Sequence, residues 1–256
     1  MNSYTLITGA SGGIGQAFAE ICAAKGHHLL LVAQSIDRLT AVQQELQRKY
    51  PVHILLFETD LSIEKGRMAL FHFTQSMGLN IEILINNAGF GDANPYLETG
   101  WSRQKAMIEV NVLAVMQLSH FYANEMKKMD RGHILNVASV AAFSAGPNMS
   151  VYYASKAFVL SFSEALYEEL RPFGISVTTL CPGPTATGFE KQANMTNSKM
   201  FVLFGAAQAS SVAKCGYKAM MRGKAIVYHG KVTFGFNIIS RILPRKFTRK
   251  LATMMN

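Results

Sequence analysis

Tyr152 and Lys156 are four residues apart in a stretch with helical spacing, which places both side chains on one face of a helix. A lysine ammonium beside a phenol favours the phenolate and lowers the pKa of the tyrosine. A tyrosine tuned in this way acts as a general acid or base near neutral pH. Tyr153 is three residues from Lys156, so spacing alone does not decide between the two tyrosines.

A glycine-rich turn, residues 8–15, joins an apolar run to a helical stretch. Its glycines at 9, 13 and 15 permit a sharp turn, close approach of a phosphate and tight packing of helix on strand. Unpaired amides at such a helix N-terminus bind the pyrophosphate of a dinucleotide. The spacing is Gly-x-x-x-Gly-x-Gly and not the commoner Gly-x-Gly-x-x-Gly. We therefore expect a dinucleotide cofactor here.

The elements that must position these residues alternate along the chain. Apolar runs predict strands at 4–8, 29–32, 52–57, 81–85, 133–137, 175–180 and 225–228. Helical spacing predicts helices at 14–25, 36–50 with Ser35 as N-cap, 61–77, 101–129 and 150–170. This alternation predicts an α/β fold with a doubly wound parallel sheet of the Rossmann type, in one domain covering residues 1–256.

Composition narrows the class of protein. The 256 residues are 49% apolar and 16% charged, which excludes a disordered chain. No stretch of about 18 residues lacks polar groups, and no basic region precedes the first apolar run, so we expect a cytoplasmic protein. Three scattered cysteines have no metal-ligand spacing, and no metal site is predicted. The charge of +9 is local, because residues 191–256 hold twelve Lys/Arg and no Asp/Glu, so nucleic-acid binding is not expected.

Residues 3–230 resemble the short-chain dehydrogenase/reductase family through several motifs in a fixed order. The motifs are Thr8-Gly9…Gly13-Ile14-Gly15, Asp60-Leu61, Asn86-Asn87-Ala88-Gly89, Asn111, Ser139, Tyr152-x-x-x-Lys156 and Pro182-Gly183. Each motif alone is common, whereas their joint order is specific. The resemblance implies hydride transfer between a nicotinamide and a carbonyl or secondary alcohol.

The resemblance also implies the roles of the catalytic residues. Asn111 would distort its helix and hold a proton-relay water, and Ser139 would orient the substrate carbonyl. Tyr152, and not Tyr153, would pass the proton. Lys156 would bind the nicotinamide ribose and tune Tyr152.

The same resemblance supplies the cofactor-binding residues. They are Gly9, Ser11, Gly13, Ile14, Gly15, Gln34, Ser35, Arg38, Asp60, Leu61, Asn87, Ala88, Gly89, Tyr152, Lys156, Pro182, Gly183 and Thr187. Ala33 stands where NAD-dependent members carry an acid, and Gln34 stands where NADP-dependent members carry an arginine. With no acid to repel a 2′-phosphate and Arg38 nearby, NADP(H) is favoured over NAD(H). Asp37 would reverse this preference if it pointed into the pocket.

The expected substrate is a lipophilic ketone or alcohol, fatty-acyl or steroid-like. By resemblance, residues 188–210 form a substrate lid whose apolar members, with three on the facing side, would line an adaptable wall. They are Met195, Met200, Phe201, Leu203 and Phe204, with Phe90, Phe143 and Met149 opposite. The alternative is that these side chains only pack the lid onto the core.

The C-terminal extension, residues 231–256, is basic and predicted to be helical. Phe247, Leu251 and Met254 share one face, with most of the cations off it. Such a helix either lies in an anionic membrane interface or packs on its own domain or a sister subunit. Packing is the favoured prediction, in a homo-oligomer that is a dimer or tetramer.

Two other functions compete with the reductase. A non-catalytic NADP(H)-sensing regulator or scaffold would not need the four residues Asn111, Ser139, Tyr152 and Lys156. A nucleotide-sugar epimerase shares the Tyr/Lys chemistry, but it usually needs a longer C-terminal substrate domain than the roughly 75 residues that follow the sixth strand.

Overall fold

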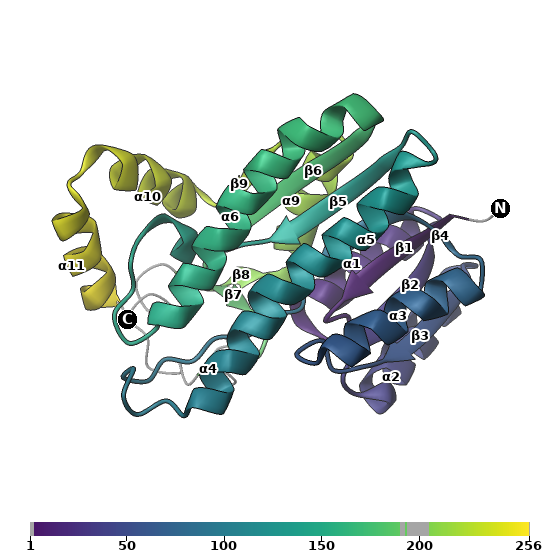
Figure 1. The fold of residues 1–256 in the computed structure, drawn as a ribbon, viewed down its shortest axis with the longest axis horizontal. Helices are drawn as coiled ribbons and strands as arrows, with labels where there is room; N and C mark the ends of the chain where they lie inside the picture. The colour runs from purple at the N-terminus through teal and green to yellow at the C-terminus, as the bar shows by residue number, and fades with distance from the viewer. Residues whose placement is uncertain (1–2, 190–192, 194–204, 256) are drawn as a thin grey trace.

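A computed structural model describes residues 3–189, 193 and 205–255, and it contains a seven-stranded parallel sheet (Figure 1). The strand order is β3-β2-β1-β4-β5-β6-β9. The strands are β1 (Ser3–Thr8), β2 (His28–Ala33), β3 (Ile54–Glu58), β4 (Asn80–Asn86), β5 (Gly132–Val137), β6 (Ile175–Pro182) and β9 (Ile226–His229). This order confirms the doubly wound parallel sheet predicted from the sequence.

Helices cover both faces of the sheet (Figure 1). One layer consists of α1 (Gly13–Ala24), α2 (Ile36–Lys49) and α9 (Ala209–Met220), and the other of α3 (Glu64–Ser76), α5 (Val115–Lys127) and α6 (Ser150–Leu170). Each layer buries apolar side chains against one face, so the central strands are apolar on both sides.

Shorter elements surround the carboxyl ends of the strands. They are α4 (Trp101–Ile108), the π-helix η1 (Glu109–Ala114), the 3-10 helices η2 (Val140–Phe143) and η3 (Arg171–Phe173), and a second, two-stranded sheet of β7 (Thr185–Ala186) with β8 (Ala207–Gln208). The order in which strands are added to the sheet reverses at β1, which pairs with β2 on one side and with β4 on the other. Ligands bind at such switch points, outside the carboxyl ends of the strands.

The boundaries differ from the prediction at two helices. The predicted helix 61–77 begins only at Glu64, because the Asp60 carboxylate accepts a hydrogen bond of 2.8 Å from the Ser62 amide and holds a turn there. The predicted helix 101–129 is interrupted by η1, where the backbone widens into a π-helix around Asn111. Helix periodicity alone does not indicate this widening.

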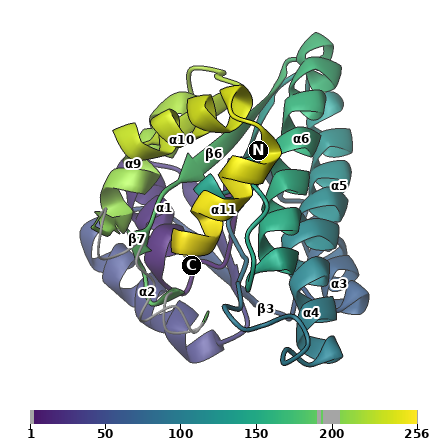
Figure 2. The ribbon, with the colours of Figure 1, turned by 90° about the vertical axis from the view of Figure 1, so that its left-hand side faces the viewer.

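The chain ends in α10 (Lys231–Ile242) and α11 (Arg245–Met255), which lie beyond one end of the sheet (Figure 1). Figure 2 looks onto that end and has α11 in the foreground. Among the described residues, no helix is both long enough and apolar enough to cross a membrane.

Candidate active site

The glycine turn closes β1 and opens α1 in backbone conformations that favour glycine. Gly9 and Gly13 have φ values of 65° and 56°. A Cβ at Gly15 would lie 2.2 Å from the Gly9 carbonyl oxygen, and one at Gly13 would lie 2.8 Å from Cβ of Thr187. The glycines therefore let α1 dock against the turn and let the Thr187 segment approach it.

Asn87, just after β4, braces this turn from the neighbouring strand. Its side-chain amide donates hydrogen bonds to the carbonyls of Thr8 (3.0 Å) and Gly9 (3.2 Å). The backbone amides of Asn87 and Ala88 both donate to the Thr8 hydroxyl at 3.0 Å. These four bonds fix the two strand ends to each other and hold the turn open toward the crevice.

Arg38 reaches across from α2 to the glycine turn. A Cβ at Gly12 would lie 2.9 Å from Nη2 of Arg38, so the guanidinium occupies the space beside Gly12. Ser35 caps α2 by accepting a hydrogen bond of 3.4 Å from the Arg38 amide. Asp37 is exposed in the first turn of α2 and does not line the cavity, so it stays away from the position where it would repel a phosphate.

Asp60, which the resemblance assigns to cofactor binding, follows β3. Burial alone would raise the pKa of its carboxyl, but hydrogen bonds from Ser62 and from the Gln34 amide hold that pKa below its ordinary value. Asp60 is therefore ionised at neutral pH and acts as an acceptor. Leu61 beside it is buried.

Ser139, Tyr152 and Lys156 converge at the ends of β5 and α6. Lys156 Nζ donates a hydrogen bond of 2.8 Å to the Val137 carbonyl, which fixes the lysine to the last residue of β5. The same Nζ lies 5.9 Å from the centre of the Tyr152 ring. Ser139 caps η2 by accepting a hydrogen bond of 3.1 Å from the Ala141 amide. All three side chains are buried or nearly so.

The pKa of Tyr152 departs from the sequence-based expectation. Burial raises it to about 12, and a side-chain hydrogen bond with Ser139 opposes this only in part. Burial also lowers the pKa of Lys156 to about 8. The sequence argument weighed the lysine charge but not the desolvation of both groups, and desolvation is the larger effect. The phenol therefore keeps its proton at neutral pH.

Asn111 lies in η1, as the resemblance to known dehydrogenases led us to expect of a distorted helix. Its side chain is fully buried and holds the backbone of Phe90, accepting from the Phe90 amide (3.1 Å) and donating to the Phe90 carbonyl (2.9 Å). It also donates to the Ser155 hydroxyl at 3.0 Å. Asn111 thus joins the loop after β4 to α6.

A cavity of about 790 Å³ joins these groups from the glycine turn to Tyr152. It is lined by almost every residue predicted from the sequence: Gly9, Ser11, Gly13, Ile14, Gln34, Ser35, Arg38, Asp60, Leu61, Asn87, Ala88, Gly89, Ser139, Tyr152, Lys156, Pro182, Gly183 and Thr187. The two predicted residues outside the lining are Gly15 and Asn111. Both lie behind the wall, where Gly15 packs against Gly9 and Asn111 against Gly89.

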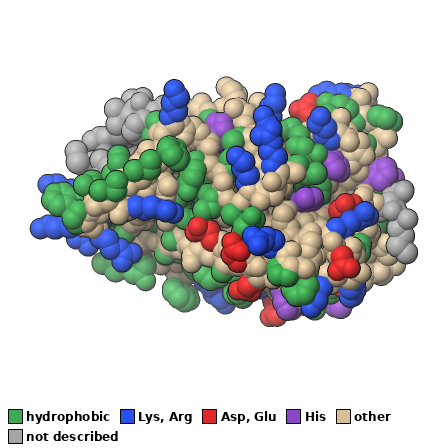
Figure 3. Space-filling view, turned by 90° about the horizontal axis from the view of Figure 1, so that it is seen from above, with side chains coloured by type: hydrophobic (Ala, Val, Ile, Leu, Met, Phe, Trp, Pro, Cys, Tyr) green, Lys and Arg blue, Asp and Glu red, His purple; other side chains and the backbone are tan. Residues whose placement is uncertain are grey.

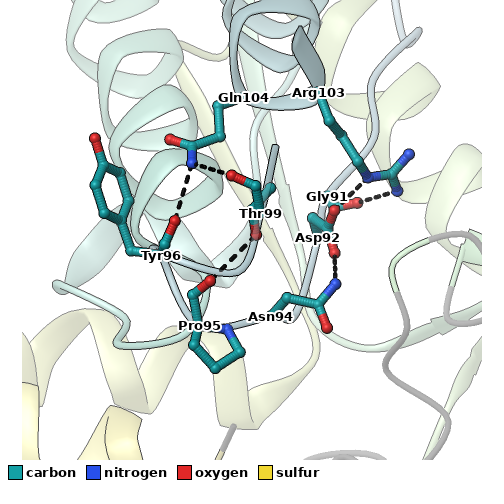
Figure 4. A network of polar contacts seen from close by, with 8 residues as sticks. All are labelled: Gly91, Asp92, Asn94, Pro95, Tyr96, Thr99, Arg103 and Gln104. Atoms are coloured by element: carbon teal, nitrogen blue, oxygen red, sulfur yellow. Dashed lines mark hydrogen bonds and ion pairs between the residues drawn. The ribbon is translucent and has the colours of Figure 1, made fainter. Parts of the chain in front are cut away.

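One part of the wall was not predicted from the sequence. Arg103, in the first turn of α4, lines the cavity with its guanidinium 5.4 Å from the centre of the Phe90 ring. It pairs with the buried Asp92 and donates to the Gly91 carbonyl at 3.4 Å (Figure 4). The available signal was the arginine itself, because a cation in the first turn of a helix interacts unfavourably with the helix dipole and an acidic neighbour such as Asp92 offsets this.

The same loop is closed by a second set of bonds. The Gln104 side chain donates to the carbonyls of Tyr96 (3.1 Å) and Thr99 (2.8 Å), and Thr99 donates to the Pro95 carbonyl (Figure 4). The loop between β4 and α4 is therefore a built wall of the cavity. Of the predicted substrate wall, Phe90 and Met149 line the cavity, whereas Phe143 does not. Met195, Met200, Phe201, Leu203 and Phe204 lie outside the described residues.

Comparisons with known proteins agree with this geometry. A short chain dehydrogenase family model matches residues 3–198. The very-long-chain 3-oxoacyl-CoA reductase of Pyrenophora tritici-repentis is 31% identical over 78% of this chain and 61% of its own length. The 17-beta-hydroxysteroid dehydrogenase type 3 of Mus musculus is 31% identical over 78% of this chain and 65% of its own. The chain thus spans less than two thirds of these relatives.

The fold is also similar to solved structures. A short-chain dehydrogenase from Sphingobium yanoikuyae in complex with NADPH has a TM-score of 0.84 and 29% identity, with 93% of each chain covered. The bulky-bulky ketone specific alcohol dehydrogenase from Comamonas testosteroni has a TM-score of 0.79 and 27% identity, with 93% of this chain and 92% of that one covered.

Proposed function

This chain belongs to the short-chain dehydrogenase family, and from that premise we propose that it is an NADP(H)-dependent oxidoreductase acting on a lipophilic ketone or secondary alcohol. The observation that carries the proposal is the single cavity that joins the glycine turn to Ser139, Tyr152 and Lys156. A binding protein needs the turn, but it does not need a buried phenol and a buried lysine at the other end.

The residues present fit a dinucleotide. The turn offers its amides at the N-terminus of α1, and substituting Gly13 would fill the space beside Thr187. A bound nicotinamide would supply hydride chemistry at the far end of the cavity. Lys156 would hold the ribose there, since only one hydrogen bond, to Val137, is made by its three donors among the described residues.

Tyr152 is the proposed proton donor. Its phenol is protonated at neutral pH, so it is ready to give a proton to the oxygen of a carbonyl that is being reduced. Ser139 would hold that oxygen beside the phenol. Asn111 holds the Phe90 backbone and α6 in fixed positions through its hydrogen bonds to Phe90 and Ser155, so that the hydroxyls of Ser139 and Tyr152 stay in place. The same phenol would take the proton back when an alcohol is oxidised.

A lipophilic substrate is supported by the chemistry of the cavity wall. Phe90, Val140, Met149 and Phe189 line the end near Tyr152. The named activities of relatives, a very-long-chain 3-oxoacyl-CoA reductase and a hydroxysteroid dehydrogenase, point to the same class of compound. The test is NADPH consumption by the purified protein with ketones of increasing chain length. Activity that is confined to short, polar carbonyls would contradict the proposal.

Arg38 is the proposed determinant for NADP(H). Its guanidinium lies beside Gly12, at the end of the cavity near α2, while Asp60 is the only acidic side chain among the described lining residues. A guanidinium binds phosphate through charge-assisted hydrogen bonds.

Arg38→Gln should weaken NADPH binding by about tenfold or more and leave NADH binding nearly unchanged, since one charge-assisted hydrogen bond to phosphate is worth about 1.5–3 kcal/mol. Dissociation constants from the fluorescence of the bound reduced cofactors measure both. Arg48→Gln, at an exposed arginine in the last turn of α2, is the control. Equal losses for NADPH and NADH in Arg38→Gln would refute the assignment.

Gln34→Arg tests the same pocket in the opposite direction. It adds a cation at the family position for the NADP arginine, so NADPH should bind more tightly relative to NADH. The hydrogen bond from Gln34 to Asp60 is lost, which should cost both cofactors equally. The ratio of the two dissociation constants is therefore the quantity to measure, and an unchanged ratio would count against a 2′-phosphate at this position.

A further inference from the structure

The helix α10 presents its apolar side to solvent. Thr233, Phe236 and Asn237 face the domain and are buried, although two of the three are polar. The opposite side carries large apolar residues that are between 41% and 75% exposed: Val232, Phe234, Ile238, Ile239 and Ile242. A surface helix of a soluble domain normally has the reverse pattern. The buried side packs on the rest of the protein, so packing within the domain does not explain why the exposed side is apolar.

Cations surround this apolar side. Leu243 and Phe247 extend it through the turn into α11, where they are 43% and 59% exposed. The two helices carry six basic residues and no acidic one: Lys231, Arg241, Arg245, Lys246, Arg249 and Lys250. In Figure 3 hydrophobic and basic side chains gather at the left-hand end of the molecule, where Figure 1 places α10 and α11. We define the seven apolar residues from Val232 to Phe247 and these six cations as the α10–α11 face.

We propose that the α10–α11 face docks on an anionic membrane surface. Exposed large apolar side chains that enter the interface, with cations that contact the lipid headgroups, are the two components of peripheral membrane binding. The sequence favoured packing of this extension on its own domain or a sister subunit. In the structure the side with Thr233, Phe236 and Ala252 is buried against the domain, whereas the large apolar residues on the other side are exposed.

Charge distinguishes a membrane from a second copy of the chain. Symmetric association through this face would place the same patch on both subunits, so six cations would meet six cations with no acid from either helix. Like charges brought together in this way oppose association. An anionic bilayer offers the complementary charge and also a medium for the seven apolar side chains.

The buried side of α10 and α11, opposite the α10–α11 face, packs beside the candidate active site. Thr233 Oγ1 would lie 3.0 Å from a Cβ at Gly183, a cavity residue. Ala252 of α11 belongs to the same buried cluster as Met149 and Tyr152. Docking here would bring the cavity close to the bilayer, from which a lipophilic ketone could enter it. That consequence rests on the proposed function, whereas membrane binding itself does not.

The test is co-sedimentation of the full chain with vesicles, measured without substrate or cofactor. Vesicles of phosphatidylcholine with about one third phosphatidylglycerol should bind the protein in low salt, and pure phosphatidylcholine vesicles should bind it much less. Ile238→Asp/Ile242→Asp should lower the partition coefficient by at least about tenfold, because charges on the apolar side are costly to insert. Arg245→Gln/Lys246→Gln/Arg249→Gln/Lys250→Gln should lower it similarly and weaken the salt dependence, since only Lys231 and Arg241 of the six cations remain.

Two matched controls change the same chemistry elsewhere. Ile63→Asp/Leu97→Asp alters exposed apolar residues outside the face, and Lys25→Gln/Lys65→Gln/Lys105→Gln/Lys214→Gln removes four exposed lysines. Both should bind vesicles like the wild type. Failure of the wild type to bind anionic vesicles, or equal losses in the controls, would overturn the proposal. So would a dimer in sedimentation velocity that Ile238→Asp/Ile242→Asp dissolves, because that result assigns the face to a second copy.

Discussion

Tyr152→Phe should lower kcat by about 10²–10⁴-fold while leaving the dissociation constant of NADPH nearly unchanged. The substitution removes one hydroxyl and keeps the ring that packs with Tyr153 and Phe189. The proton that this phenol carries is then absent when the carbonyl oxygen gains charge. Steady-state kinetics on a lipophilic ketone and cofactor fluorescence titration measure the two quantities.

Tyr153→Phe is the matched control for that experiment. Tyr153 is the next residue on the same helix, is also buried and also lines the cavity, but it is not the residue four positions before Lys156. We expect its variant to keep most of the turnover. If the two variants lose activity equally, or if Tyr152→Phe retains near-normal kcat, the proton donor has been misassigned. Cofactor binding without turnover in the wild type would instead support the sensor alternative.

Lys156→Met should lower kcat/KM by at least about 10²-fold, because it removes both the ribose contact and the charge beside Tyr152. The same substitution should change how stability depends on pH. Burial lowers the folded-state pKa of Lys156 from 10.5 to about 8. Between these values the unfolded chain holds a proton that the folded chain does not, so the free energy of unfolding rises with pH across this window.

The magnitude follows from the size of the shift. Each pKa unit corresponds to about 1.4 kcal/mol. The titration of Lys156 should therefore raise the free energy of unfolding by up to about 3 kcal/mol as the pH goes from 8 to 10.5. Denaturant unfolding of wild type and Lys156→Met at a series of pH values isolates this group, because every other titration is shared. Lys214→Met, at an exposed lysine, should give a difference that does not vary with pH. A flat difference for Lys156→Met would mean that the buried ammonium is not destabilising.

The parts of the site that the sequence predicted are set by local rules. The turn between β1 and α1 needs its glycines for backbone reasons that are visible in one segment, and α6 spans Ser150–Leu170 as its periodicity predicts. Residues that directly follow parallel strands lie at the carboxyl edge of the sheet, whatever the conformation of the loops. For that reason Asn87, after β4, and Ser139, after β5, both line the cavity.

The parts that the sequence did not predict depend on contacts between distant segments. Arg103 pairs with Asp92 across a loop whose shape no motif specifies. The raised pKa of Tyr152 depends on the summed desolvation from several elements. Which side of α10 faces the domain likewise depends on its packing site.

The bonds between Asn87 and the glycine turn have a consequence for the order of folding. The hydrogen bond from the Asn87 amide to the Thr8 carbonyl joins residues that are 79 positions apart. It forms only after β4 has paired with β1, because that pairing brings the two strand ends together. A nascent chain that has formed only β1, α1 and β2 therefore has the turn but not its brace. Closing such a long loop is slow and costs chain entropy. The glycine turn therefore gains its brace only after β4 has joined the sheet beside β1.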